Sequence, residues 1–200
     1  AAVYDSMNAV LAKLHNFDPA AIGLGDFGRG DNYVARQVER WSKQYRASET
    51  ETIGDMDRLI DWLPHNIPPQ TAVRIVHGDY RLDNVIFHRG EPRILAVLDW
   101  ELSTLGHPLA DFSYHCMSWR LSPGEFRGIA GYDWKALGMP TEEEYVAAYF
   151  RRTGRTLQQC RGQRLRRQPG PLDTGAAEEI SAHAQALGSV PPARLGGCSP

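Results

Sequence analysis

Aromatic residues are confined to one part of the chain, and this limits where a hydrophobic core can form. All 19 aromatic residues of the 200-residue chain lie at or before Phe150. Residues 156–200 contain none, although the overall aromatic content of 10% would give that segment four or five. Because a segment with few large apolar side chains cannot offset the entropy lost on folding, we predict an ordered unit over 1–155 and an atypical, disordered tail over 156–200.

Composition and charge exclude several classes of protein. Hydrophobic residues make up 42% of the chain and charged residues 23%, as in ordinary globular domains. No apolar run approaches the ~18 residues of a transmembrane helix, and the first residues lack the features of a signal peptide. A net charge of −2 gives no electrostatic reason to bind nucleic acid or acidic membranes. Three widely spaced cysteines favour neither structural zinc nor a disulfide framework, so we expect a cytoplasmic protein with no nucleic-acid or membrane partner.

The hydrophobic periodicity changes from helical to extended and back along the ordered part. Asp31 is expected to cap the second helix, and Thr141 with Glu144 forms a capping-box pattern that opens the last one. Residues 88–92 have the composition of a turn and predict a hairpin between the strands on either side. The pattern predicts an α+β fold, mainly helical, with helices over about 3–14, 31–45, 56–63, 109–119 and 141–150 and strands over 72–76, 85–87 and 94–98.

Chemistry-bearing residues gather around the predicted hairpin. The run from His77 to Asn84 reads H-x-D-x-x-x-x-N, with Asp79 on a loop, and Asp99 and Glu101 follow the last strand. Adjacent strands lie ~4.8 Å apart, so Asn84 and Asp99 can converge on one point. Amide and carboxylate oxygens suit Mg²⁺ held against phosphate groups, and a nearby loop aspartate can accept a proton from a hydroxyl. Each residue alone could be an ordinary turn or strand-end residue, but together they match the phosphoryl-transfer set of kinases.

These residues resemble those of the aminoglycoside phosphotransferase (APH)-type kinases, which have the protein-kinase-like fold. The likeness covers roughly residues 3–155 and is closest to the branch that is fused to acyl-CoA dehydrogenases in animals. Three stretches carry it: 23–28, 76–87 and 96–111, the last reading AVLDWELSTLGHPLAD.

The resemblance implies a role for each site residue. Asp79 would be the catalytic base, and Asn84 and Asp99 would bind Mg²⁺. Asp111 matches a buried aspartate that braces the catalytic loop, and we expect His77 to support that loop. Glu101 holds the second acidic position of a D-x-D/E motif and would hold a metal-bound water.

The resemblance also implies a C-terminal lobe without the N-terminal lobe that holds the nucleotide. The chain has only the lysines Lys13, Lys43 and Lys135, and none lies on a predicted strand. Two functions therefore stay open. One is an ATP- and Mg²⁺-dependent phosphotransferase acting on a hydroxyl of a small molecule, either an antibiotic or a hydroxyacyl metabolite. The other is a truncated, non-catalytic remnant or binding module of that kinase family. The isolated chain is expected to be inactive without its N-terminal lobe, and the expected protein partners are that missing lobe or an acyl-CoA-dehydrogenase-type neighbour.

Two further patterns are interpreted as structural. Residues 23–28 satisfy G-x-G-x-x-G, but a phosphate-binding loop of this kind needs a strand before it, and here a helix and a turn precede it. We therefore predict a plain loop between helices. His107, His115 and Cys116 lack the spacing of an ordinary zinc site, which favours a role in core packing.

Overall fold

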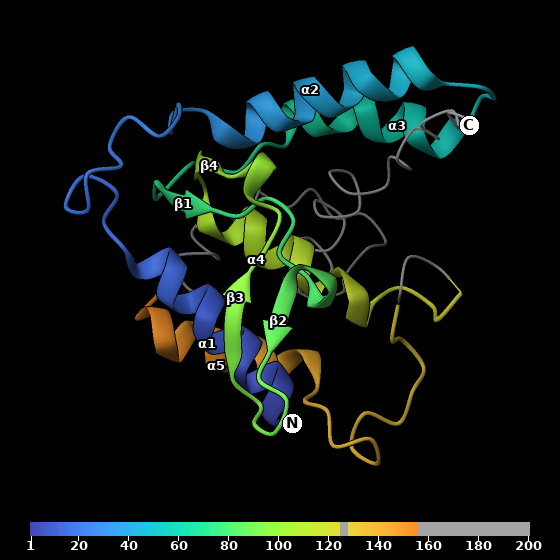
Figure 1. Ribbon diagram of the computed structural model, residues 1–200. Helices are drawn as coiled ribbons and strands as arrows, with labels where there is room; N and C mark the ends of the chain where they lie inside the picture. The colour runs from blue at the N-terminus through green and yellow to red at the C-terminus, as the bar shows by residue number, and fades with distance from the viewer. Residues whose placement is uncertain (125–127, 156–200) are drawn as a thin grey trace, which may run out of the picture.

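A computed structural model describes residues 1–124 and 128–155, which form a mainly helical unit with two small antiparallel sheets (Figure 1). The α+β fold expected from the sequence is confirmed. The predicted tail, 156–200, lies outside the described residues, so the division into two parts stays a prediction. Across the described ranges no helix is long and apolar enough to cross a membrane. The helices are α1 (Ala2–Asn16), α2 (Tyr33–Ser48), α3 (Gly54–Trp62), α4 (Pro108–Cys116) and α5 (Glu142–Thr153).

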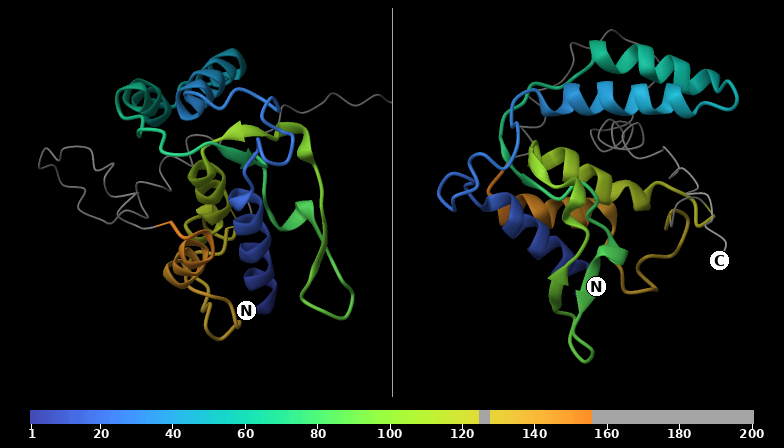
Figure 2. Two further views of the ribbon diagram at one scale, coloured as in Figure 1. Left: turned by 90° about the vertical axis from the view of Figure 1, so that its left-hand side faces the viewer. Right: turned by 45° about the horizontal axis from the view of Figure 1, so that its top comes forward.

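The larger core lies between α1, α4 and α5. Helices α1 and α5 run side by side although they come from opposite ends of the ordered part, as both views of Figure 2 show. Leu11 of α1 and Tyr149 of α5 are fully buried, and the ring of Phe112 stacks on Tyr149 at 3.8 Å between centroids. Burial of such large apolar surfaces is the main stabilising contribution in a unit of this size. The core therefore fixes α4, and with it Asp111, against the first helix.

Helix α5 begins and ends as its sequence dictates. Thr141 and Glu144 form the predicted capping box, with the Thr141 Oγ1 accepting from the Glu144 N–H at 3.2 Å. The helix continues beyond Phe150 to Thr153 and ends at Gly154, whose φ of 66° lies in the left-handed region that glycine adopts easily.

Helices α2 and α3 form a separate layer above this core (Figures 1 and 2). Val34, Val38 and Leu63 bury their side chains there in a smaller cluster that includes Val76 of the first strand. The expectation that Asp31 caps α2 is wrong. The helix starts after Asn32, whose backbone is left-handed and whose side chain forms no cap. The Asp31 carboxylate lies one residue too early and pairs with Arg29 at 3.4 Å and Arg36 at 3.7 Å.

The predicted hairpin is confirmed, but a further strand pairs with the first. Strands β2 (Val85–Phe87) and β3 (Ile94–Val97) are antiparallel, with Val85 opposite Val97. Strand β1 (Arg74–Val76) pairs with β4 (Thr104–Gly106), which the hydrophobic pattern had not indicated. The β1–β4 pair fixes the two ends of the segment from His77 to Ser103, and the β2–β3 hairpin lies within it. The candidate site lies in this segment.

Candidate active site

Asp79 lies on a short loop between β1 and the 3₁₀ turn Leu82–Asn84, referred to below as the Asp79 loop (residues 77–81). One carboxylate oxygen, Oδ1, accepts a hydrogen bond from the Tyr114 hydroxyl at 2.6 Å. The other, Oδ2, accepts from Nδ2 of Asn84 at 2.9 Å and lies 3.2 Å from Nε of Arg81. The side chain is 15% exposed, so the carboxylate is oriented from several sides while part of it still faces solvent.

The orientation of the Asn84 amide follows from its partners. Its Nδ2 donates to both the backbone carbonyl and the carboxylate of Asp79, at 2.9 Å each. Both partners are acceptors only, so the nitrogen faces Asp79 and the amide oxygen faces away. The backbone carbonyl of Asn84 accepts from the Leu98 N–H at 2.8 Å. The hairpin therefore brings Asn84 beside the residue that precedes Asp99.

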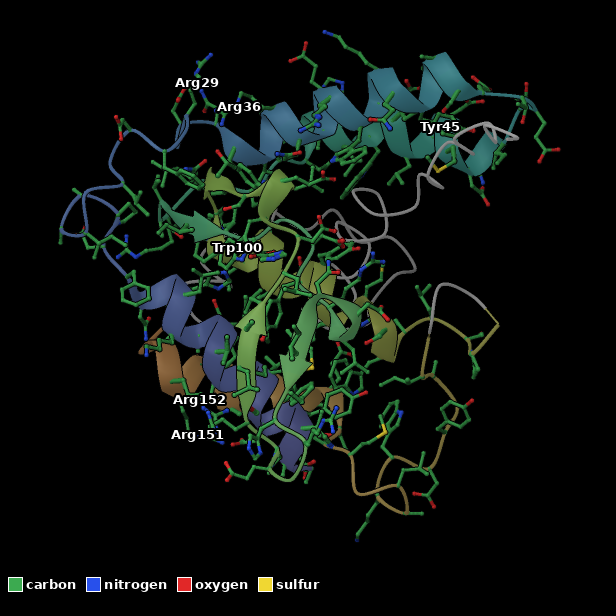
Figure 3. The ribbon with its side chains drawn as sticks, in the orientation of Figure 1. Arg29, Arg36, Tyr45, Trp100, Arg151 and Arg152 are labelled. Atoms are coloured by element: carbon green, nitrogen blue, oxygen red, sulfur yellow. The ribbon has the colours of Figure 1, made fainter. Side chains whose placement is uncertain are left out.

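Asp99 ends the hairpin in an uncommon backbone conformation, with φ 65° and ψ 57°. This left-handed region is costly for residues other than glycine, and such residues concentrate at functional sites. The Asp99 carboxylate is exposed and bonds to none of the residues that the structure describes. Trp100 follows, and its indole N–H donates to the Val97 carbonyl at 2.8 Å. In Figure 3 Trp100 lies between the hairpin and α2, while Glu101 is exposed on the 3₁₀ turn Trp100–Leu102.

An amide oxygen and an exposed carboxylate on neighbouring hairpin positions fit a divalent cation such as Mg²⁺. This ion prefers oxygen ligands and commonly takes only one or two carboxylates from a protein, the remaining ligands being water and substrate phosphates. Within the two described ranges, histidine, cysteine, aspartate and glutamate do not gather into a group of three or more that could hold a metal by themselves. The residues therefore fit a metal that is held partly by a phosphorylated substrate.

His77 is fully buried and supports the Asp79 loop from within. Its Nδ1 accepts from the Asp79 N–H at 3.2 Å, which fixes the ring proton on Nε2. That Nε2–H donates to the Leu98 carbonyl at 2.8 Å. The imidazole thus ties the loop to the end of the hairpin, and both ring nitrogens are occupied.

Asp111 binds the backbone of the same loop from the side of α4. Its carboxylate accepts from the N–H groups of His77 at 2.6 Å and Gly78 at 3.1 Å. Burial alone would raise the pKa of this carboxyl, but the hydrogen bonds from His15 and from the His77 backbone lower the pKa below its ordinary value. The group is therefore ionised, and it fixes the direction of the chain just before Asp79.

A buried histidine of α1 completes this arrangement. His15 Nε2 lies 3.2 Å from the Asp111 carboxylate, and its Nδ1 lies 2.6 Å from the Tyr149 hydroxyl. Burial lowers the pKa of His15, so the neutral ring donates to Asp111 and accepts from Tyr149. The Asp79 loop is thereby linked through two side chains to α1 and α5.

The two histidines and the cysteine that the sequence analysis set aside as a zinc site, His107, His115 and Cys116, belong to the core or to a helix end. His107 Nδ1 accepts from the Leu109 N–H at the start of α4, and His115 lies 2.7 Å from the Tyr145 hydroxyl. Burial lowers the pKa of each ring to about 4. Cys116 is buried, and burial raises the pKa of its thiol. The structural interpretation of these three residues agrees with their positions, and residues 23–28 form turns between α1 and α2, as predicted.

Sequence reasoning missed Tyr114 and His15 as parts of this site. Tyr114 follows Asp111 by three residues, which places both on one face of α4. That spacing was a usable signal. His15 gave none, since a histidine near the end of an amphipathic helix is compatible with many environments, and only the packing of α1 against α4 brings it to Asp111.

Known proteins are similar to this chain over most of the described residues. A profile of the phosphotransferase enzyme family, APH, matches residues 1–162. Acyl-CoA dehydrogenase family member 10 of Mus musculus is 50% identical over 151 residues, which cover 74% of this chain and 14% of that protein. The chain therefore spans only a small part of that relative.

Solved structures show the same fold. A Ralstonia eutropha protein described as an aminoglycoside phosphotransferase superposes with a TM-score of 0.75 at 50% identity, over 93% of this chain and 62% of that one. A macrolide 2′-phosphotransferase of type I superposes with a TM-score of 0.56 at 18% identity, over 93% of this chain and 50% of that one. At that identity the second match speaks for the fold alone.

Proposed function

The chain belongs to the phosphotransferase enzyme family, and from this membership we propose that it supplies the base and the metal-binding residues of an ATP- and Mg²⁺-dependent transfer of phosphate to a hydroxyl of a small molecule. One observation carries the proposal above all. Asp79 is held by Tyr114 and Asn84 beside the hairpin end that presents Asp99.

Each residue has a distinct part in this mechanism. The hydroxyl oxygen of the acceptor forms a bond to the terminal phosphorus of ATP as the bond between that phosphorus and ADP breaks, and the hydroxyl proton passes to Asp79. Asn84 and Asp99 would hold Mg²⁺, which neutralises charge on the phosphate oxygens when it is bound. Catalysis of this kind consists mainly of positioning and charge stabilisation.

The supporting residues keep Asp79 in place. We assign His77 and Asp111 the role of supporting the Asp79 loop, because both accept hydrogen bonds from its backbone N–H groups. The second ring nitrogen of His77 is occupied by the Leu98 carbonyl. Glu101 is exposed two residues after Asp99 and is assigned the weaker role of holding a water bound to the metal.

The test is transfer of labelled γ-phosphate from ATP to hydroxylated small molecules by the full-length protein. Asp79→Asn keeps the size of the side chain but removes the base, and loss of a general base costs roughly 10²–10⁴-fold in rate. Asp61→Asn is the matched control, at an exposed aspartate of α3 that should keep its activity. Equal transfer by the wild type and Asp79→Asn would remove Asp79 from the mechanism, and absence of transfer in every form would favour the non-catalytic alternative.

A further inference from the structure

A charged cleft lies between α2 and the segment that follows the hairpin. It has a volume of about 580 Å³. Basic residues line its α2 side, and the other side is formed by residues 101–104, which include the 3₁₀ turn after Asp99 and the start of β4. We call it the basic cleft; the residues that matter here are Arg29, Arg36, Arg40, Lys43, Glu101 and Ser103.

The cleft is positive although the whole chain is negative. Four basic and two acidic residues line it, and the neighbouring Asp31 pairs with both Arg29 and Arg36, which leaves an excess of one positive charge, whereas the net charge of the chain is −2. One acid, Glu39, is already paired with Lys43 at 2.6 Å. Arg40 has no acidic partner within the described ranges, and its guanidinium lies over the Trp41 ring at 5.4 Å. Exposed basic side chains grouped in a concave site attract anions.

Two buried polar atoms on opposite walls of the cleft have no hydrogen-bond partner among residues 1–124 and 128–155. They are Nη1 of Arg36 and Oγ of Ser103. Nη1 of Arg36 is ion-paired with Oδ1 of Asp31 at 3.7 Å, which is too long for a hydrogen bond, and Nη2 of the same side chain donates to the Arg29 carbonyl. Buried polar groups are almost always satisfied, and an unpaired one carries its full desolvation cost. Acceptor oxygens of a bound anion would supply the missing hydrogen-bond partner on each wall.

The cleft adjoins the proposed reaction centre through its lining residues. Glu101 follows Asp99 by two positions. Leu102, also on the wall, packs against Gly78 so closely that a Cβ added there would lie 2.8 Å from the Leu102 carbonyl oxygen. Gly78 is the neighbour of Asp79, so one wall of the cleft is shared with the Asp79 loop. Figure 3 shows Arg29 and Arg36 at the N-terminal end of α2, on this side of the molecule.

We propose that the basic cleft binds a phosphate or carboxylate group of the acceptor molecule, held by Arg36, Arg40 and Ser103. This rests on the proposed function, and it narrows the acceptor to an anionic hydroxylated metabolite. A polycationic aminoglycoside would be repelled by the excess positive charge of the cleft. The nucleotide also carries phosphate groups, so the test has to separate the two sources of the anion.

The test titrates inorganic phosphate into the full-length protein at low salt, without ATP, and follows binding by changes in backbone amide resonances. Arg40→Glu reverses a charge of the cleft, and Arg151→Glu makes the same change on an exposed arginine of α5, far from the cleft in Figure 3. Charge-assisted hydrogen bonds are about twice as strong as neutral ones, so phosphate affinity should fall about tenfold or more in Arg40→Glu. It should stay unchanged in Arg151→Glu. Ser103→Ala, which removes a buried unpaired hydroxyl, should weaken phosphate binding while the protein stays folded.

The outcomes separate the cleft from the proposed function. Phosphate binding that depends on Arg40 and Ser103, weakens as sodium chloride is raised, and persists in saturating Mg-ADP supports the proposal. Absence of binding, equal loss in Arg151→Glu, or displacement of phosphate by Mg-ADP would overturn it, the last because the anion would then belong to the nucleotide. The phosphate titration measures no turnover, so it is independent of the transfer assay described above. A protein that binds phosphate in the cleft but fails that assay would refute only the proposed function.

Discussion

At the scale of single residues, Tyr114 is the group that most directly controls the Asp79 carboxylate. Its hydroxyl donates to Oδ1 at 2.6 Å. Burial, followed by the hydrogen bond to Asp79, raises the pKa of Tyr114 well above its ordinary value, so the hydroxyl keeps its proton at every physiological pH. The contact is therefore a permanent donor to an anion, and we assign Tyr114 as a positioning residue.

Tyr114→Phe should lower kcat by about tenfold with little change in the KM for ATP, because one charge-assisted hydrogen bond is lost while the base remains. Tyr132→Phe, at a half-exposed tyrosine away from the site, is the matched control. A Tyr114→Phe protein with an unchanged kcat would show that Asn84 and Arg81 suffice to orient Asp79.

At the scale of elements, two glycines with nearly the same backbone conformation allow the cost of a left-handed backbone to be distinguished from the cost of a steric clash. Gly78 and Gly131 have φ of 85° and 83°. A Cβ on Gly78 would lie 2.8 Å from the Leu102 carbonyl oxygen, whereas nothing lies within 4 Å of one on Gly131. Both positions disfavour a side chain, but only Gly78 must also displace backbone.

Gly131→Ala should therefore cost about 1–2 kcal/mol, the cost of a left-handed conformation for a residue with a Cβ. Gly78→Ala should cost more and also reduce activity, because relief of the clash moves either the Asp79 loop or the turn after Asp99. Urea unfolding of both variants measures the difference in the free energy of unfolding. Equal losses in the two variants would mean that the contact with Leu102 relaxes without cost.

The hairpin could be predicted from the sequence, whereas the second sheet could not. Strands β2 and β3 are contiguous in sequence and flank a turn, so local pattern and pairing agree. Strand β4 is three residues long, ends in Gly106 and pairs with a strand about 30 residues earlier, so it has neither a period to read nor a turn to mark it. Its pairing depends on tertiary context, and so does the left-handed backbone of Asp99.

The site was partly predictable for a related reason. Asp79, Asn84 and Asp99 could be grouped from the sequence because a short hairpin joins them. In the structure Asp79 and Asn84 are hydrogen-bonded, and Asp99 lies at the adjacent end of the hairpin. His15 reaches Asp111 only because α1 packs against α4 and α5, a contact between residues 96 positions apart.

At the scale of the whole molecule, neutral histidines buried at both ends of α4 make folding depend on pH. Burial lowers the pKa of His107 and of His115 to about 4, whereas an exposed histidine in the unfolded chain titrates near 6.5. Between these values the unfolded chain binds protons that the folded protein does not, so the free energy of unfolding falls as the pH falls. Their contribution is fully present above about pH 6.5 and is lost as the pH approaches 4, by at most on the order of 3 kcal/mol for each ring.

We therefore expect the free energy of unfolding, measured by urea at pH 7, 6 and 5, to decrease steadily through this range. His115→Gln should flatten the slope by about one proton, roughly 1.4 kcal/mol per pH unit, because glutamine does not titrate. It should also lower stability at pH 7, since the His115 contacts to the Tyr145 hydroxyl and the Tyr80 carbonyl are remade imperfectly. His65→Gln, at an exposed histidine beyond α3, should leave the slope unchanged. A wild-type protein equally stable at pH 5 and pH 7 would mean that the core opens to solvate these rings before the protein unfolds.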